Sequence, residues 1–184
     1  MLVSSSASAT AVLQAAQTRH KISSLTLLAP VVPLKYTTIQ RHIIPRLAPY
    51  FIKKDQAKGN DPDGLFGNMF LSKKRMKYYY DNYASHDHAK EKPGLIAGDG
   101  VSEVWQKKLR SAYEIVSEQK IPTLILSARY DNVVVPVRQA EIARTIGAQY
   151  KELQSGHYIP LDVEAENAAK LVTKFLQSIP KKVE

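Results

Sequence analysis

Cysteine is missing from all 184 residues, which excludes disulfides, thiolate nucleophiles and cysteine metal ligands. A chain without cysteine is typical of a reducing compartment, and we expect a cytoplasmic location. Long hydrophobic runs are missing too, because no stretch reaches the roughly 20 apolar residues of a membrane-spanning helix. The apolar content of 44% is enough for one core of ordinary size.

Acidic residues are missing from the first 54 positions, whereas the whole chain carries a net charge of +9. A start that is rich in serine and alanine, carries arginine and lacks acids is also typical of a mitochondrial or plastid transit peptide. A mitochondrial location is therefore the alternative. A secretory signal is disfavoured because no basic region precedes the apolar part.

The most informative part of the chain lies between Ile121 and Leu176. The residues from Pro122 to Ala128 are apolar and predict a buried strand, and Asp131 lies just beyond its end. His157 follows a second predicted strand, Gln149–Leu153. Loops at the carboxyl ends of neighbouring parallel strands meet at one edge of a sheet. We therefore expect Asp131 to hold the tautomer of His157 and to stabilise its charged form, as in a nucleophilic triad.

The segment from Ile121 to Pro136, followed by Gly156-His157-Tyr-Ile-Pro-Leu161 and a closing helix, resembles the C-terminal part of an α/β-hydrolase. The resemblance implies an α/β fold with strands 5–8 of a mostly parallel sheet, flanking helices and a mainly helical cap. In that family the triad acid follows the seventh strand and the histidine follows the eighth. The chain order Ser, Asp, His then places the nucleophile upstream.

The resemblance assigns the nucleophile to Ser6. A helix-like segment runs to about Thr18, and Leu25–Pro30 predicts the next strand, as in the family. Ser4 and Ser8 stand where the family's G-x-S-x-G turn has glycines, and serine is small enough for that strained turn. The N–H of Ala7 would then be one oxyanion donor. The alternative is that the serines belong to a frayed terminus.

On this alignment only Leu2 and Val3 remain of the nucleophile strand, and strands one to four are missing. The family's second oxyanion donor comes from a loop after strand three, and losing one donor typically costs about 100- to 1000-fold in rate. The unpaired sheet edge would also be a liability, unless an oligomer or a partner chain covers it. We therefore expect residues 1–30 and 118–184 to form a truncated hydrolase core whose activity depends on a missing half.

Residues 31–117 lie where α/β-hydrolases insert a cap, and this stretch is too long for a plain loop. Four aromatic residues are candidates for the lining of a pocket for a small ester or lipid-like substrate: Phe66, Phe70, Tyr79 and Trp105. Alternatively they only pack the cap onto the body.

Two further motifs resemble binding sites but are better interpreted as solvent-exposed residues. Lys73-Lys74-Arg75 and the following tyrosines could contact nucleic acid or an anionic lipid surface, but runs of charge are usually solvated helix faces. We expect no nucleic-acid partner and at most weak contact with an anionic membrane. His86 and His88 flank Asp87 without a third ligand at a recognised spacing, so we expect no metal and no cofactor.

Each catalytic assignment has a structural alternative. Asp131 could cap the helix that begins near Pro136, and His157 could be structural. Asp162 could be the triad acid, although a cap of a helix over Val163–Leu176 is the better interpretation. The sequence thus predicts a serine hydrolase that cleaves an ester or amide through Ser6, His157 and Asp131. The alternative is an inactive hydrolase-like remnant or interaction module.

Overall fold

A computed structural model describes residues 2–5, 12, 22–33, 70–83, 103–131 and 134–180. Four parallel strands form one sheet in the order β1-β2-β3-β4, which is also their order in the chain. The strands are β1 (Leu2–Ser5), β2 (Leu25–Leu28), β3 (Thr123–Ala128) and β4 (Gln149–Leu153). The helices are α4 (Lys73–Tyr83), α6 (Glu103–Glu118), α7 (Pro136–Ile146), the short 3-10 helix η2 (Ile159–Leu161) and α8 (Ala165–Ser178).

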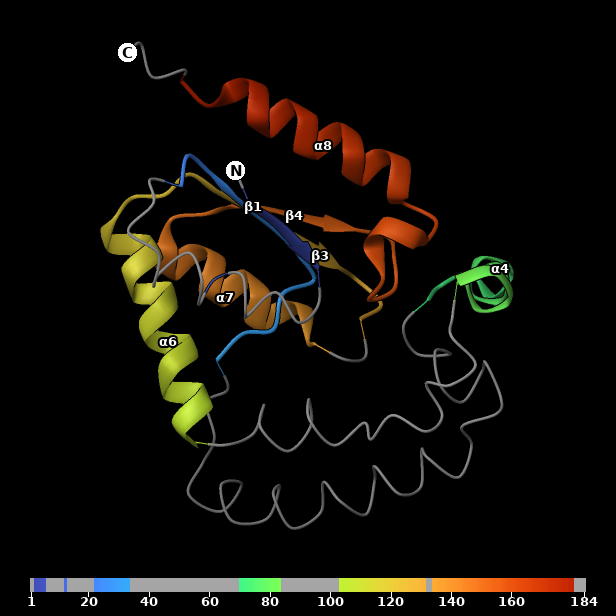
Figure 1. The fold of residues 1–184 in the computed structure, drawn as a ribbon, viewed down its shortest axis with the longest axis horizontal. Coiled ribbons are helices and arrows are strands. Elements are labelled where there is room, and N and C mark those ends of the chain that lie inside the picture. Colours follow the sequence, from blue (N-terminus) through green and yellow to red (C-terminus); the bar gives the residue numbers. More distant parts are fainter. Residues whose placement is uncertain are drawn as a thin grey trace.

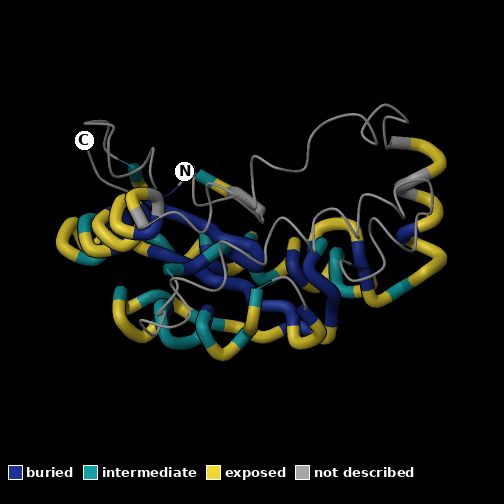
Figure 2. The backbone as a smooth tube through the Cα atoms, turned by 90° about the horizontal axis from the view of Figure 1, so that it is seen from below, coloured by how far each residue is buried: buried dark blue, intermediate teal, exposed yellow. Residues whose placement is uncertain are grey.

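The two central strands are buried along their whole length. Strands that are covered on both faces need apolar side chains at consecutive positions, and the runs LTLL of β2 and TLILSA of β3 supply them. Successive side chains point to opposite faces, so each run contributes to two cores. Figure 2 shows a buried band through the middle of the molecule, where β2 and β3 lie, with exposed positions on the outer sides of the helices.

One face of the sheet is covered by α6 and α7 (Figure 1). Leu25, Leu27 and Ile125 meet Leu109 and Tyr113 of α6 in a buried cluster. The hydroxyl of Tyr113 donates to the carbonyl of Val31 at 3.0 Å, so the helix is also fixed to the segment after β2. The division into a core and a cap at residues 31–117 stays a prediction, and α6 is the part of that range that packs on the sheet.

The opposite face is covered by α8 (Figure 1). Leu126 and Leu153 pack with Ile159 of η2 and with Ala168 and Phe175 of α8. The helix is amphipathic, and its apolar stripe turns toward the strands. The sheet is therefore the middle of three layers, as expected for an α/β fold, and the predicted fold class is confirmed.

The carboxyl ends of all four strands lie at one edge of the sheet. β1 extends to Ser5, two residues beyond the predicted Leu2 and Val3. β1 is an outer strand that pairs only with β2 among the described residues, and Val3 is 46% exposed. Beyond β2 the chain turns at Ala29, whose φ of 44° is the left-handed conformation and whose N–H donates to the carbonyl of Leu126.

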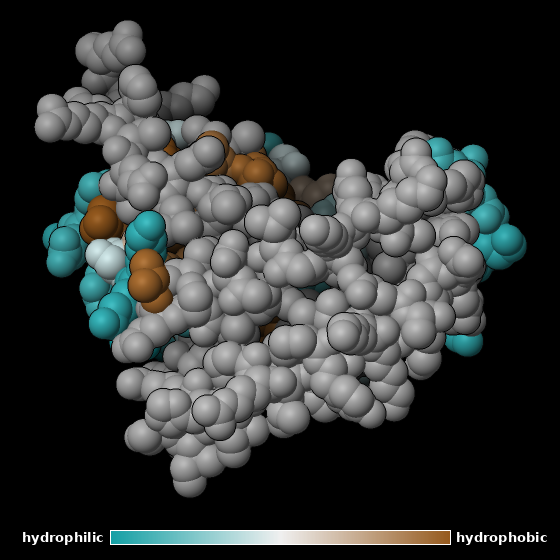
Figure 3. Space-filling model, turned by 60° about the horizontal axis from the view of Figure 1, so that its bottom comes forward, coloured by the Kyte–Doolittle hydropathy of each residue, from teal (hydrophilic) through white to brown (hydrophobic). Residues whose placement is uncertain are grey.

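Helix α4 presents a charged surface. Lys73, Lys74 and Arg75 are exposed, while Met76 is buried, so the basic run belongs to a solvated face as the simpler interpretation expects. Figure 3 shows hydrophilic side chains gathered over α4, at the right of the view. None of the helices described is long and apolar enough to cross a membrane.

Candidate active site

Asp131 lies in the loop that follows β3, and its carboxylate organises that loop. Its Oδ1 accepts the N–H of Val134 at 2.8 Å, and its own N–H donates to the carbonyl of Ala128. The residue that caps α7 is Val135, which makes no side-chain capping bond. Asp131 Oδ1 therefore holds the backbone just ahead of α7, but Asp131 is not the N-cap of that helix. Its other carboxylate oxygen, Oδ2, makes a separate contact.

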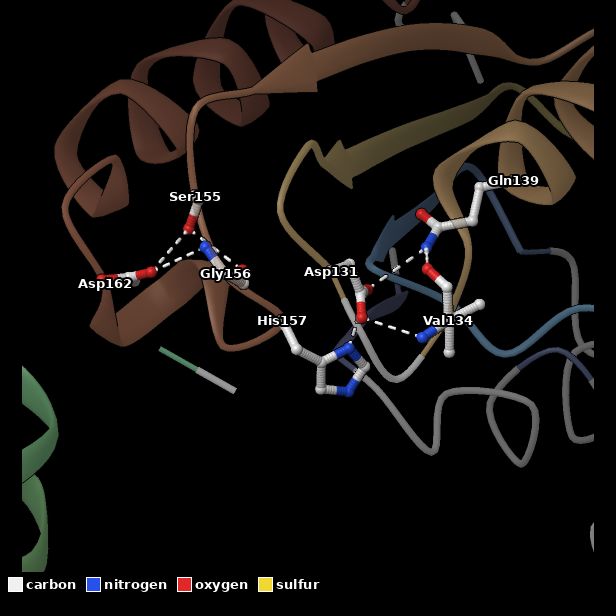
Figure 4. A network of polar contacts seen from close by, with 7 residues as sticks. All are labelled: Asp131, Val134, Gln139, Ser155, Gly156, His157 and Asp162. Atoms are coloured by element: carbon white, nitrogen blue, oxygen red, sulfur yellow. Dashed lines mark hydrogen bonds and ion pairs between the residues drawn. The ribbon is translucent and has the colours of Figure 1, made fainter. Parts of the chain in front are cut away.

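That second oxygen meets His157. The distance from Asp131 Oδ2 to His157 Nδ1 is 2.8 Å, and both side chains are fully buried (Figure 4). The two loops are also joined by their backbones, because Arg129 N donates to Leu153 O and Tyr130 N donates to Ser155 O. The structure thus brings together the two residues that the sequence singled out. A carboxylate that accepts from Nδ1–H leaves Nε2 as the basic nitrogen of the ring.

Gln139 is a site residue that the sequence analysis missed. It lies in the first turns of α7, is fully buried, and its Nε2 donates to Val134 O at 3.1 Å and to Asp131 Oδ2 at 3.4 Å. The amide thus holds the same oxygen that faces His157 (Figure 4). The available signal was a polar residue one helical turn beyond Pro136, on the inner face of an amphipathic helix.

Asp162 has a different role from both of those predicted for it. Its carboxylate lies toward Ser155 and Gly156 and not toward the imidazole (Figure 4), and the residue that caps α8 is Glu164, which makes no side-chain capping bond. Its Oδ2 accepts the N–H of Gly156 at 2.7 Å and the N–H of Leu71 at 2.6 Å, and its Oδ1 accepts the N–H of Ser72 at 3.1 Å. The predicted helix cap is therefore wrong: the carboxylate holds a distant segment and the histidine loop.

The pKa of Asp162 reflects these contacts. Burial pushes its pKa up, but backbone N–H groups outweigh burial and hold the pKa below its ordinary value. The donors are Leu71, Gly156, Ser72 and Val163. Asp162 therefore carries a buried negative charge at neutral pH.

Phe70 is the one predicted pocket residue whose side chain is described. It is buried and stacks on Tyr158 with ring centroids 5.4 Å apart and an interplanar angle of 13°. Tyr158 in turn meets His157 edge to face at 5.9 Å. The aromatic contact between the segment ahead of α4 and the histidine loop thus reaches the imidazole itself.

The remaining predicted site residues lie outside the described parts of the chain. Ser6 and Ala7 follow β1, and Ser5 is the last described residue before them. Phe66 and the group His86, Asp87 and His88 are also outside these ranges. Tyr79 and Trp105 belong to α4 and α6, but their side chains are not described.

The cavity between α6 and α7 lies apart from the Asp131–His157 pair. Within the described ranges, no group of three histidine or acidic side chains could hold a metal ion. A cavity of about 650 Å³ lies between α6 and α7 and is lined by residues such as Val32, Tyr113 and Ile142. Neither Asp131 nor His157 lines it.

The comparisons with solved structures find α/β-hydrolases. The chain is 18% identical to a monoacylglycerol lipase from Paleococcus ferrophilus, with a TM-score of 0.61 over 97% of this chain and 68% of that one. A haloalkane dehalogenase from Agrobacterium tumefaciens gives 17% identity and a TM-score of 0.68 over 97% of this chain and 66% of that one. An enol-lactonase from Burkholderia xenovorans gives 17% identity and a TM-score of 0.55 over 96% of this chain and 65% of that one.

The chain thus spans 65% of the length of that lactonase and about two thirds of the other two proteins. No protein-family model and no curated protein matches it. At these identities the likeness concerns the fold, and the named activities belong to the matched proteins. The parallel sheet, its flanking helices and these matches show that the chain has part of the α/β-hydrolase fold.

Proposed function

We propose that the chain carries a serine-hydrolase site in which Ser6 is the nucleophile, His157 the general base and Asp131 the residue that orients the base. The observation that supports the proposal most is the 2.8 Å contact between Asp131 Oδ2 and His157 Nδ1, with both side chains buried. A buried histidine whose Nδ1–H is held by a carboxylate presents its basic Nε2 to a partner.

The position of Ser6 supports its part in the proposal. β1 ends at Ser5, at the same sheet edge as the loops of Asp131 and His157, so Ser6 is the first residue beyond that strand. Nucleophiles of this fold occupy a sharp turn directly after a strand. The candidates for nucleophile, acid and base therefore follow the carboxyl ends of three parallel strands, which lie on the same side of the sheet.

The proposed reaction is acyl transfer in two stages. His157 Nε2 takes the proton of Ser6 Oγ as the oxygen attacks the carbonyl carbon of an ester or amide, and the Ala7 N–H donates to the oxyanion. The imidazolium then gives its proton to the leaving alcohol or amine. In the second stage water, activated by the same nitrogen, releases the acid. Asp131 stabilises the imidazolium in both stages.

The substrate class we propose is a small or lipid-like ester. The named neighbours include a monoacylglycerol lipase and an enol-lactonase, whose names denote ester substrates. Phe70 and Tyr158 form an aromatic wall beside His157, which suits an apolar acyl or alcohol group. Phe66, Tyr79 and Trp105 remain proposed contributors to the same pocket.

A second candidate function is an inactive hydrolase-like module. The observation that favours it is that β1, the strand that precedes Ser6, is an outer strand of the sheet that the described residues form. The backbone of an outer strand with one partner is held less firmly than that of a paired one, and an oxyanion site needs donors at fixed positions. A partner chain that pairs with β1 would convert the second candidate into the first.

Hydrolysis of p-nitrophenyl butyrate by the full 184-residue chain separates the two candidates. The proposal expects turnover that Ser6→Ala and His157→Ala each abolish, while the matched change Ser23→Ala, at an exposed serine ahead of β2, leaves it intact. Turnover that survives Ser6→Ala would contradict the proposed nucleophile. A folded chain without turnover would favour the inactive module.

A further inference from the structure

Two segments that are far apart in the sequence meet at a single buried side chain. Asp162 Oδ2 accepts the N–H of Gly156, next to His157, and the N–H of Leu71, 91 positions away. Asp162 Oδ1 accepts the N–H of Ser72, which directly precedes α4. We call the group formed by Asp162, Gly156, Leu71 and Ser72 the Asp162 junction.

We infer that Asp162 is a positioning residue, which fixes the histidine loop by holding it to the start of α4. The inference rests on the proposed function, because it gives the residue a part in placing His157. Asp162 does not touch the imidazole in the described contacts and acts through the neighbouring Gly156. Its consequence is that a displacement of the start of α4 is transmitted to the histidine loop through this carboxylate.

The chemistry of the junction favours this role over a local helix cap. A carboxylate is an acceptor on both oxygens, and here it satisfies backbone N–H groups of two separate segments. Asp162 is fully buried, so water does not compete for these donors. Asparagine has the same shape but cannot accept from all of these N–H groups, since its NH₂ group is a donor and only its oxygen accepts.

The aromatic contact beside the junction extends the coupling. Phe70 directly precedes Leu71, and its ring stacks on Tyr158, the residue after His157. The segment ahead of α4 therefore contacts the histidine loop twice, through a charged hydrogen-bond centre and through a ring pair. Residues 70–72 and 156–158 form one unit across the site.

Amide hydrogen exchange on the full chain tests the inference without any need for turnover. In Asp162→Asn we expect exchange to rise at least tenfold at Leu71 and Ser72 and at Gly156 together, and the Nδ1 proton resonance of His157 to shift. Asp81→Asn is the matched control, because Asp81 is an exposed acid on the same α4 helix, paired with Lys77 at 3.0 Å. It should change neither segment.

A pair of variants at Ser72 keeps the inference testable if Asp162→Asn does not fold. Ser72→Pro removes the N–H that donates to Asp162, whereas Ser72→Ala keeps it and loses only the hydroxyl that accepts from Arg75 N. We expect Ser72→Pro alone to raise exchange at Gly156, on the far side of the junction. A rise confined to the mutated segment would overturn the inference.

The rate of Ser6 labelling by a fluorophosphonate separates this inference from the proposed function. Both together predict labelling that slows about 10- to 100-fold in Asp162→Asn, with the shape of its pH profile altered. If the unmodified chain is not labelled, the proposed function fails while the exchange and resonance results still decide the coupling. If exchange in Asp162→Asn rises in both segments but Ser6 is labelled at the normal rate, Asp162 does not position the base, and this result would overturn the inference.

Discussion

Two buried aspartates lie on either side of the histidine loop, and they differ in what they bind. Asp131 accepts from an imidazole nitrogen, from the N–H of Val134 and from Gln139. Asp162 accepts from backbone N–H groups, among them those of Leu71, Ser72 and Gly156, and from the hydroxyl of Ser155 at 3.3 Å. Only the first set contains a side chain that can act as a general base, the imidazole of His157.

The same chemical group, a carboxylate, therefore has a different role in Asp131 and in Asp162. A carboxylate beside an imidazole stabilises the charge that the ring acquires when it takes up a proton, so its effect concerns a reaction. A carboxylate among backbone N–H groups stabilises one conformation of the chain, so its effect concerns position and stability. We therefore expect substitutions of the two aspartates to differ in which measurement they change most.

The largest expected effect is that of Asp131→Asn on the rate of Ser6 acylation. The amide cannot stabilise the imidazolium and favours the wrong tautomer, and such a change lowers the rate of comparable triads by about 10,000-fold. The measurement is the rate of inactivation by a fluorophosphonate, together with thermal unfolding. A variant that is folded but loses less than about tenfold would contradict the role of Asp131.

The next effect is that of Asp162→Asn on stability and its pH dependence. Loss of charged hydrogen bonds by buried donors should lower the free energy of unfolding by about 2–4 kcal/mol at pH 7. The pKa of Asp162 is lowered on folding, so its carboxylate stabilises the fold fully above the unfolded value of about 3.9 and stops doing so as the pH falls through the folded pKa.

Urea unfolding at pH 7 and pH 3 measures both parts of this prediction. The unmodified chain should lose more stability on acidification than Asp162→Asn does, whereas Asp81→Asn, which changes an exposed acid, should behave like the unmodified chain. Equal losses in all three proteins would show that the pKa of Asp162 is not lowered by folding.

A smaller effect is expected from Phe70→Leu on substrate preference. The change removes a ring stacked at 5.4 Å on Tyr158, and such aromatic pairs contribute about 0.5–1.5 kcal/mol beyond burial. We expect kcat/KM for p-nitrophenyl butyrate to fall about two- to tenfold. Phe175→Leu makes the same change in α8, away from the site, and should affect stability but not the preference among acyl chains. If Phe70→Leu and Phe175→Leu changed the preference among acyl chains equally, the result would contradict a place for Phe70 in the substrate pocket.

The smallest expected effect is that of Gln139→Leu. Its amide lies 3.4 Å from Asp131 Oδ2, a long contact that orients the carboxylate without carrying charge. We expect acylation to slow about two- to fivefold, since a hydrogen bond this long from a neutral donor contributes about 1 kcal/mol or less. Gln149→Leu, on an exposed position of β4, is the control. A loss as large as that of Asp131→Asn would make Gln139 a principal residue of the site.

The sequence predicted the parts of this site that are set by local pattern. β4 begins and ends at the residues predicted for it, Gln149 and Leu153, and α8 differs from the predicted range by two residues at each end. The parallel order of β3 and β4 is enough to bring Asp131 and His157 together, because both follow strand ends. The strand pattern and the order of the strands in the chain are thus enough to predict that Asp131 and His157 lie close together.

The contacts of Asp162 could not be predicted in this way. Its donors include Leu71, 91 positions earlier, and nothing in the residues around Asp162 indicates that distant segment. The cap of α8 was the expected role because aspartate near a helix start usually caps it. Gln139 was missed for a related reason: its polar side chain turns inward to a loop that precedes its own helix.

Fluorophosphonate labelling of the full chain, with peptide mapping, tests the central claim most directly. The account predicts one labelled residue, Ser6, with labelling abolished in His157→Ala and slowed about 10,000-fold in Asp131→Asn. Labelling of a different serine, or labelling of Ser6 that is unchanged in His157→Ala, would contradict it.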